Sequence, residues 1–320
     1  MPSIAAAPQS TASATPAIDR PILIGGGEID YSILGLLRRA RERELPVIEL
    51  LVGAESNPGL TWNVDADTLV LNGQEIRPGA GFLRYDVFNA MADPRPSVSF
   101  RATAWHITAH GWMLSHEDVR MLNRGYIGQS NKPFMLRTAA NCGLAVPQTI
   151  ITNDMEMLEQ LHGADGMIAK PVPGGGYTKL LADLLADTPR RDGRSAAPAF
   201  VQRRMVTPEV RIYGVGGRFI PFAVISDQLD YRADENSRVE LMPLESVDPS
   251  VVAALARLME RLRMEYGAAD FRTHPDTGEL VFLEINSGPM FAGFDAVSDH
   301  AVSDAILDYL VGGERANASS

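Results

Sequence analysis

An acidic and an amide side chain stand two residues apart at the end of an apolar stretch, Leu280–Asn286 (LVFLEIN). Residues two apart share one face of a β-strand, so we expect Glu284 and Asn286 to lie on the same face as Leu280 and Phe282. One face of this apolar strand thus becomes polar just before the chain turns. Two polar groups in this position need a partner, either a ligand or water.

The same stretch is predicted to form a hairpin with residues 268–272 (AADFR), because residues 273–278 between them are rich in turn formers. A tip at the end of that turn places Asp270 opposite Glu284, with Cβ atoms ~4.5–5.5 Å apart. Two carboxylates so placed repel each other unless a divalent cation lies between them. With Asn286 they offer only oxygen ligands, which suit Mg²⁺ or Mn²⁺. The alternative is an exposed hairpin edge whose acids point into water.

Two lysines and a glycine loop could hold the phosphates of a nucleotide. Magnesium usually keeps coordination positions for substrate phosphates, so the predicted metal site implies a nucleoside triphosphate. Lys170 lies on an apolar strand just before Gly174, Gly175 and Gly176, whose backbone N–H groups could approach phosphate oxygens closely. Lys132 lies in the first turn of a predicted helix, where a cation opposes the helix dipole unless an anion is near. Taken singly, each lysine could equally be a solvated surface residue.

Two arginines could hold a second anion. Arg211 is predicted on a strand of the hairpin 209–226, on the same face as Glu209, where it would bind a phosphate or carboxylate bidentately or form a surface ion pair. Arg272 is two residues from Asp270 and therefore on the same face. Acids for a metal, lysines for phosphate and arginines for a second anion are the parts of a phosphoryl-transfer site.

The composition is that of an ordinary globular protein. The chain has 320 residues, 45% hydrophobic and 22% charged, a length that predicts two or three domains. Its net charge of −11 argues against a nucleic-acid partner. The single cysteine, Cys142, predicts no disulfide, no zinc cluster and a cytoplasmic location, and no apolar run reaches the ~18 residues of a membrane span. His106 and His110 are spaced i, i+4, but no third ligand near them indicates zinc.

The hydrophobic pattern predicts a parallel sheet in the first third of the chain. Two apolar strands, residues 21–26 and 46–52, flank a helix over residues 31–44, and this β-α-β order favours parallel pairing. We further expect a strand over residues 81–88 and mostly helix over residues 99–125.

From residue 166 onward the pattern is that of antiparallel strands. A hairpin is expected over residues 209–226, around a glycine pair, and a helix over residues 249–266. Residues 182–198 are polar and turn-rich, and we expect them to be mobile.

The order of these parts resembles the ATP-grasp superfamily. It is most similar to the branch that contains the ribosomal-protein glutamate ligases and the ligases that cross-link ribosomally made peptides, the graspetides such as microviridins. The resemblance runs from residue 131 (NKPFMLRTAANCGLAVPQTIIT) to LEINSGP at residue 289, and more weakly includes FLRYDVF at residues 82–88. It implies an α+β / α/β chain with an N-terminal α/β (pre-ATP-grasp) domain, a small central lobe and a C-terminal antiparallel-sheet lobe. The expected divisions are a disordered leader 1–19, the N-terminal domain 20–125, the small lobe 126–190, the C-terminal lobe 191–312 and a tail 313–320.

The resemblance also implies roles for single residues. The nucleotide would be bound by Lys132, Lys170, Gly174, Gly175, Gly176, Gln202, Arg203 and Arg204. Catalysis would depend on Arg211, Lys170 and Arg272. Magnesium would be held by Asp270, Glu284 and Asn286, which agrees with the independent hairpin argument.

The implied activity is that of an ATP-dependent carboxylate–amine ligase, acting through an acyl phosphate on an amino acid or a peptide. One alternative is a peptide macrocyclase that forms side-chain ester or amide links. Another is a kinase on the same fold that phosphorylates a hydroxyl, and a third is a nucleotide-binding regulator without activity. The expected partners are ATP, Mg²⁺ (or Mn²⁺) and the amino-acid or peptide substrate, with no nucleic acid and no membrane; a homo-oligomer is left open.

Overall fold

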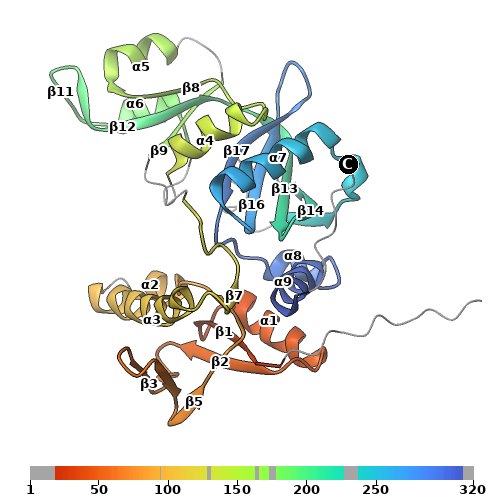
Figure 1. The fold of residues 1–320 in the computed structure, drawn as a ribbon. Coiled ribbons are helices and arrows are strands. Elements are labelled where there is room, and N and C mark those ends of the chain that lie inside the picture. The colour runs from red at the N-terminus through yellow and green to blue at the C-terminus, as the bar shows by residue number, and fades with distance from the viewer. Residues whose placement is uncertain are drawn as a thin grey trace, which may run out of the picture.

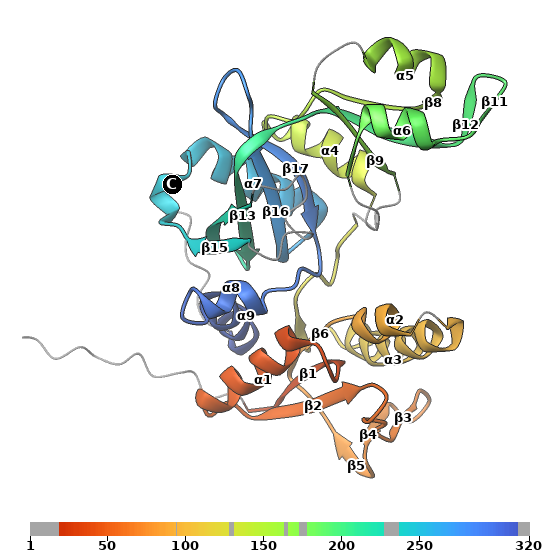
Figure 2. The same cartoon turned by 180° about the vertical axis from the view of Figure 1, so that it is seen from behind.

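The computed structural model describes most of the chain, namely residues 19–93, 95–127, 131–162, 166–172, 178–226 and 237–312. The glycines expected to cover the phosphates, Gly174, Gly175 and Gly176, lie outside these ranges, as do residues 1–18 of the expected leader and the expected tail. No helix within the ranges has both the length and the apolar character needed to cross a bilayer. The first third of the chain forms one end of the molecule, two further sheets form the other, and α8 and α9 lie between them (Figures 1 and 2).

The N-terminal sheet is parallel, as the β-α-β pattern predicts. Its strands in spatial order are β2 (Val47–Val52), β1 (Ile22–Gly27), β6 (Ala80–Leu83) and β7 (Arg120–Met121). Helix α1 (Tyr31–Glu42) connects β1 and β2 and begins at Asp30, whose side chain accepts the N–H of Ser32 and caps the free end of the helix. A small antiparallel sheet follows β2, made of β3 (Leu60–Asn63), β4 (Thr68–Leu71) and β5 (Gln74–Ile76).

Two predictions for this part were wrong at their ends. The strand expected over residues 81–88 stops at Leu83, and helix α2 (Phe88–Ala92) begins five residues later. Arg84 and Asp86 at the break are both buried, and Arg84 donates from Nε to Asp30 Oδ2. The helix expected over residues 99–125 is α3 (Pro96–Ser115), which ends before strand β7.

The central sheet is antiparallel, and β12 is its longest strand. Its elements are β8 (Thr149–Asp154), β9 (Met167–Pro171), β10 (Lys179–Leu180), β11 (Arg190–Arg191) and β12 (Arg194–Arg203), with helices α5 (Met155–His162) and α6 (Leu181–Asp187) packed against them. Residues 182–198, which look polar and turn-rich in the sequence, form helix and hairpin, with Leu181 and neighbouring leucines packed into this core. Strand β12 pairs with both β8 and β9, so this sheet extends to Arg203, beyond the boundary expected at residue 190.

The C-terminal sheet carries the predicted hairpins. Its strands in spatial order are β15 (Arg238–Leu241), β14 (Arg218–Ile225), β13 (Val206–Val215), β16 (Tyr266–Thr273) and β17 (Leu280–Asn286). The glycine pair between β13 and β14 has φ values of +58° and +93°, a backbone that suits glycine, so the hairpin prediction is confirmed. Helices α4 (Lys132–Asn141) and α7 (Pro249–Leu262) share an apolar core with one face of this sheet. The 3₁₀ turn Leu244–Ser246 precedes α7.

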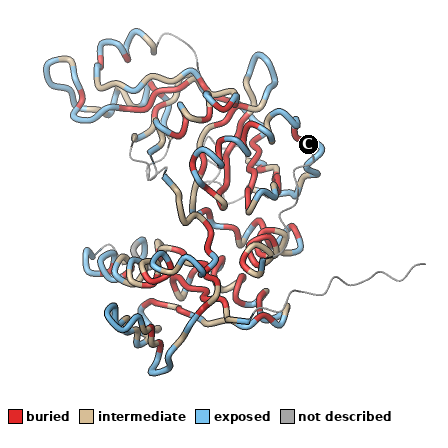
Figure 3. Tube along the Cα trace, in the orientation of Figure 1, coloured by how far each residue is buried: buried red, intermediate tan, exposed pale blue. Residues whose placement is uncertain are grey.

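The N-terminal and C-terminal sheets are joined by a second apolar core. Helices α8 (Ala292–Ala296) and α9 (Ala301–Val311) pack with α1 between the two sheets. The buried residues form continuous tracts through this junction in Figure 3, while the outer helices and loops are exposed. Ion pairs link α1 to α9 at the edge of this core. The guanidinium of Arg39 binds the Asp304 carboxylate at 2.7 Å, and Arg43 binds Asp304 and Asp308 at 3.0 and 2.8 Å. The two ends of the molecule are therefore held together by packing and charge.

Candidate active site

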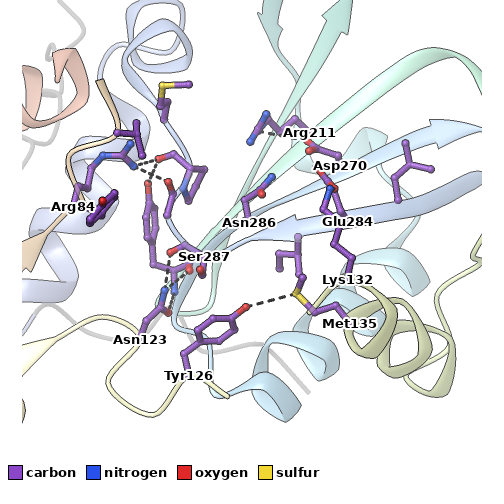
Figure 4. Close-up of a pocket in the computed structure, with 18 of the residues that line it drawn as sticks. Arg84, Asn123, Tyr126, Lys132, Met135, Arg211, Asp270, Glu284, Asn286 and Ser287 are labelled. Carbon is purple, nitrogen blue, oxygen red and sulfur yellow. Dashed lines mark hydrogen bonds and ion pairs between the residues drawn. The ribbon is translucent and has the colours of Figure 1, made fainter. Parts of the chain in front are cut away.

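Four charged side chains form a row across the C-terminal sheet. Arg211 on β13 is the register partner of Asp270 on β16, which in turn is the partner of Glu284 on β17. Lys132, at the start of α4, reaches Glu284 from the far side with its Nζ 2.6 Å from Oε2. Arg211 Nε lies 3.6 Å from Asp270 Oδ1. The row therefore runs cation, anion, anion, cation, with the two carboxylates adjacent, as the hairpin argument predicted (Figure 4).

One detail of the predicted hairpin was wrong. The expected alternation placed Phe282 on the same face as Glu284, but Phe282 is fully buried in the core beneath α7 together with Ile285. The register shifts between Asp270 and Phe271, so Phe282 pairs with Phe271 although Glu284 still pairs with Asp270. This β-bulge adds one residue to β17 and reverses the alternation behind Glu284. The pairing of Asp270 with Glu284 is unaffected, because the bulge lies between this pair and the turn.

A second pair of charges lies beside the first row. Glu209 and Arg272 are register partners, and both are buried. Arg272 donates from Nε and Nη2 to Glu209 Oε2, at 2.8 and 2.6 Å. Arg272 was expected to share the ligand of Asp270; it lines the same cavity, but its guanidinium is already bound to a carboxylate. Its contribution is therefore to fix Glu209 and to add positive charge beside the row.

Lys170 faces the row from the central sheet. Desolvation lowers the pKa of its ammonium below the ordinary lysine value; the charges of Lys132 and Arg272 act in the same direction, while those of Glu284 and Asp270 oppose it. Its Nζ lies 5.7 Å from the centre of the Phe200 ring, close enough for a cation–π contact. A partly desolvated ammonium on the cavity wall gains stability when an anion binds beside it.

These groups line one cavity of about 1010 Å³. One wall is the charged row with Asn286. The facing walls come from Lys170, from residues 202–205 at the end of β12, and from the N-terminal part of the molecule. Gln202 is buried and donates from Nε2 to Thr149 Oγ1 at 2.9 Å. Its Oε1 has no hydrogen-bond partner within the described ranges. This oxygen is the acceptor that a donor on a bound ligand would satisfy.

The two arginines after Gln202 were expected to contact the nucleotide through their backbones. Both line the cavity. The guanidinium of Arg203 lies 2.8 Å from the carboxylate of Asp276, at the tip of the β16–β17 hairpin, so it ties the central sheet to the C-terminal sheet. The backbone N–H of Arg204 bonds the carbonyl of Gly166 at 2.5 Å. The side chain of Arg203 is thus engaged between the two sheets.

Sequence reasoning missed Arg84, which holds the chain just after the predicted metal ligands. Arg84 Nε donates to Asp30 Oδ2 at 2.8 Å, and its Nη1 donates to the carbonyls of Gly288, at 2.9 Å, and of Pro289. The hydroxyl of Tyr266 also donates a hydrogen bond to the Pro289 carbonyl, at 3.0 Å. Arg84, at the end of a strand of the N-terminal sheet, therefore holds the segment that follows Asn286 by hydrogen bonds (Figure 4). The signal in the sequence was a lone arginine at the end of an apolar strand.

Further hydrogen bonds hold the segment that follows Asn286. Asn123 donates from Nδ2 to the Ser287 carbonyl at 3.0 Å, and Ser32 Oγ accepts the backbone N–H of Phe291 at 3.0 Å. The backbone from residue 287 to 291 is thus bonded at several points to elements far away in the sequence. These several hydrogen bonds fix the end of β17 and the position of its last side chains.

Replacing Arg84 by methionine should lower the free energy of unfolding by roughly 3–5 kcal/mol, because the Asp30 carboxylate would remain buried without its cation. Urea denaturation followed by tryptophan fluorescence measures the change. The matched control is Arg38→Met, whose ion pair with Glu42 is exposed and 3.9 Å long, and which should change stability by ~1 kcal/mol or less. Equal effects of the two variants would contradict the role assigned to Arg84.

Replacing Lys170 by methionine should stabilise the nucleotide-free protein at neutral pH, because its buried charge is unfavourable there. The folded-state pKa is below the unfolded value, so in the interval between them the unfolded chain binds more protons and stability rises with pH. The advantage of Lys170→Met over the wild type should therefore shrink as the pH approaches about 10.4, the ordinary lysine value. Thermal unfolding at neutral and alkaline pH measures it, with the exposed Lys179→Met as control. A pH-independent difference would refute the prediction.

The donor set fits a hard divalent cation. Within the described ranges, no three histidine, cysteine, aspartate or glutamate side chains gather into a metal-binding group. Asp270 and Glu284 instead offer two carboxylates, and Asn286 on the same strand offers an amide oxygen. Magnesium usually takes one or two carboxylates and completes its shell with water and substrate phosphates. This set therefore suits a magnesium ion that is shared with a nucleotide.

The arrangement of sheets defines the class of protein: the chain has the ATP-grasp fold. The ATP-grasp ligase PsnB, complexed with a minimal precursor, matches 92% of this chain and 99% of its own, with a TM-score of 0.73 and 23% identity. The macrocyclase MdnC from Microcystis aeruginosa MRC, bound with precursor peptide MdnA, matches 92% and 100%, with a TM-score of 0.69 and 18% identity. The VanG D-Ala:D-Ser ligase from Enterococcus faecalis matches 92% of this chain and 98% of its own, with a TM-score of 0.55 and 13% identity.

The fold expected from the sequence resemblance is confirmed by these similarities. The particular structures that the chain resembles include an ATP-grasp ligase complexed with a minimal precursor, a macrocyclase bound with a precursor peptide and a D-Ala:D-Ser ligase. No model of a protein family matches the sequence, and a search of curated proteins finds no match. Three-dimensional structure therefore carries the relationship.

Proposed function

We propose that the protein is an ATP- and magnesium-dependent ligase that activates a carboxylate and joins it to an amine or hydroxyl of a peptide. The observation that carries the proposal is the row Arg211, Asp270, Glu284 and Lys132 inside a large cavity. Two adjacent carboxylates flanked by cations suit a metal-bound polyphosphate beside a second anion. The solved PsnB complex with Mg and ADP supports the same cofactors.

Each side chain of the site has a role in this reaction. Asp270, Glu284 and Asn286 would hold magnesium, which supplies charge neutralisation for the nucleotide phosphates. Lys132 and Lys170 bind phosphate oxygens. Lys170 gains from this because an anion restores the stability of its desolvated charge. Gln202 accepts a hydrogen bond from the base through its free Oε1, and Arg211 orients the substrate carboxylate and its acyl phosphate.

The chemistry needs no protein nucleophile. A carboxylate oxygen of the substrate attacks the γ-phosphorus of ATP, the bond to the bridging oxygen breaks, and ADP leaves with its electron pair. The acceptor amine or hydroxyl then adds to the acyl carbon, the carbon–oxygen bond to phosphate breaks, and the acceptor loses a proton. The residues contribute by positioning the reactants and by stabilising the charge that moves between them.

A peptide substrate is favoured over a free amino acid by the extent of the cavity. Its volume of about 1010 Å³ lies at the upper end of the range for small-molecule sites. It reaches from the charged row to the wall formed by the N-terminal part, which leaves space for a second reactant beside the nucleotide. PsnB and MdnC were both solved with precursor peptides, which supports the same substrate class. Residues 20–125 would then select the peptide.

ADP release from ATP across a panel of amino acids and synthetic acidic peptides tests the proposal, with products read by mass. Loss of one water within a single peptide indicates an internal ester or amide, and gain of an amino-acid residue indicates condensation. Retention of a phosphate on the product would instead indicate a kinase. Absence of ADP release over the whole panel, with magnesium and with manganese, would contradict a ligase.

A further inference from the structure

Two histidines face the cavity from its N-terminal wall, away from the charged row. His106 and His110 lie one turn apart on α3, and both line the cavity. Their rings are stacked, with centroids 5.3 Å apart and an angle of 13° between the planes. No step assigned above uses either ring.

Neither imidazole has a hydrogen-bond partner within the described ranges, and the Nδ1 of His106 is fully buried. The remaining histidines with ring contacts differ: His116 bonds Asp67 and the Trp112 carbonyl, and His274 caps a turn. Polar groups that line a cavity without a protein partner are the ones that a ligand would satisfy.

The ring of His106 is restrained from the side. The ring of Tyr85 stands edge-on to His106, with centroids 6.0 Å apart at 85°. Its hydroxyl lies 3.3 Å from Thr103 Oγ1, one turn before His106 on the same helix. Tyr85 therefore restrains the ring of His106, and the stacking of the two rings places His110 beside it.

Both imidazoles are held neutral. Burial lowers the pKa of His106 to about 4, with the neighbouring His110 as a second cause. Burial also lowers the pKa of His110, and the charge of Arg124 adds to this effect. Arg124 itself donates to the carbonyls of Met113 and Val119. A neutral imidazole has a ring nitrogen able to accept a proton.

We propose that His106 and His110 form the acceptor subsite of the ligase, where they bind the attacking hydroxyl or amine and receive its proton. The inference rests on the proposed function. The donor carboxylate needs the cations of the charged row, so the acceptor must approach from another wall, and this wall carries cavity-lining polar groups without partners. Arg124 beside His110 disfavours an acceptor that arrives as an ammonium ion, because like charges repel.

The step is balanced without another reactant. The acceptor oxygen or nitrogen adds to the acyl carbon, and its proton passes to an imidazole nitrogen of the pair. Phosphate leaves with the electron pair of the broken carbon–oxygen bond, and the imidazolium then returns its proton to phosphate or water. Removing a general base lowers the rate by roughly 10²–10⁴-fold. The lowered pKa of both imidazoles makes them weaker bases, so we expect the lower end of this range.

Hydroxylamine separates the two halves of the reaction. It captures an acyl phosphate without help from a protein base, so hydroxamate reports the donor half and cross-linked peptide reports the whole. Wild type, His106→Gln, His110→Gln and the double variant are each incubated with ATP, Mg²⁺ and synthetic peptides that carry glutamate, threonine and lysine. We expect the double variant to lose ~100-fold or more in cross-linked product while hydroxamate formation stays near the wild-type level.

His274→Gln, on the exposed turn of the β16–β17 hairpin, is the matched control and should change neither product. His106→Phe keeps a flat ring beside His110 without its nitrogens, and serves if a glutamine variant fails to fold. A parallel loss of hydroxamate and cross-link, or no loss of either, would overturn the acceptor role. If the wild-type protein yields neither hydroxamate nor ADP, the proposed function fails, and the acceptor role fails with it.

Discussion

Replacing Glu284 by glutamine is expected to reduce ADP release by ~100-fold or more while the protein remains folded. Glutamine has nearly the same shape, but its amide carries no charge and only one acceptor oxygen. The change removes one of the two adjacent carboxylates that would hold the cation, and it deprives Lys132 of the partner now 2.6 Å away. Both losses weaken the binding of a magnesium-bound polyphosphate.

The measurement is ADP release at saturating ATP with increasing magnesium. Circular dichroism and thermal unfolding verify that the variant is folded. The control is Glu279→Gln, because Glu279 is an exposed carboxylate directly before the same strand and does not line the cavity. Wild-type turnover by Glu284→Gln would contradict the cation site, and equal losses in the two glutamine variants would attribute the effect to the hairpin in general.

Replacing Arg211 by methionine is the second change with a large expected effect, a loss of roughly 10²–10³-fold in ADP release. Arg211 is buried, and it is the cation at the end of the row opposite Lys132. Its guanidinium lies 5.3 Å from the centre of the Phe294 ring and 5.7 Å from that of Tyr213, so both rings contact it as cation–π partners. Lysine cannot reproduce the planar, bidentate geometry, so Arg211→Lys should recover only part of the activity.

Hydroxamate formation in the presence of hydroxylamine tests this variant directly, because Arg211 is assigned to the donor half of the reaction. We expect hydroxamate and ADP to fall together, unlike the result expected for the two histidines. Arg218→Met, in the same hairpin but paired with Asp308 outside the cavity, is the matched control. A variant that retains hydroxamate formation but loses cross-linking would move Arg211 to the acceptor side.

Local rules predicted the hairpin of the candidate site well. The turn formers after residue 272 and the alternation of β16 were enough to place Asp270 opposite Glu284, and the register confirms that pairing. The helix predicted to begin near Lys132 is likewise local, because the side chain of Asn131 accepts the N–H of Phe134 three residues on. In each case a side chain acts on residues a few positions away, so the sequence window contains the whole interaction.

The same rules failed where distant segments supply the stabilisation. Residues 182–198 look polar and turn-rich, yet Leu181 is buried in the core of the central sheet and the segment forms helix and hairpin. Phe282 departed from the expected face because a bulge forms where the strand meets the core beneath α7. The partners of Arg84 could not be predicted from the sequence, since Asp30 and Pro289 lie 54 and 205 residues away.

The sequence by itself determined the chemical types of the site and their local spacing: two carboxylates and an amide on one hairpin, lysines before a glycine loop and at a helix start, and arginines on neighbouring strands. Only the tertiary structure decided how they combine. It brought Lys132 onto Glu284, bound Arg272 to Glu209, and placed His106 and His110 on the wall of the same cavity. The reason is physical: alternation and turn chemistry act between near neighbours, whereas a cavity is enclosed by segments whose contact depends on packing of the whole chain.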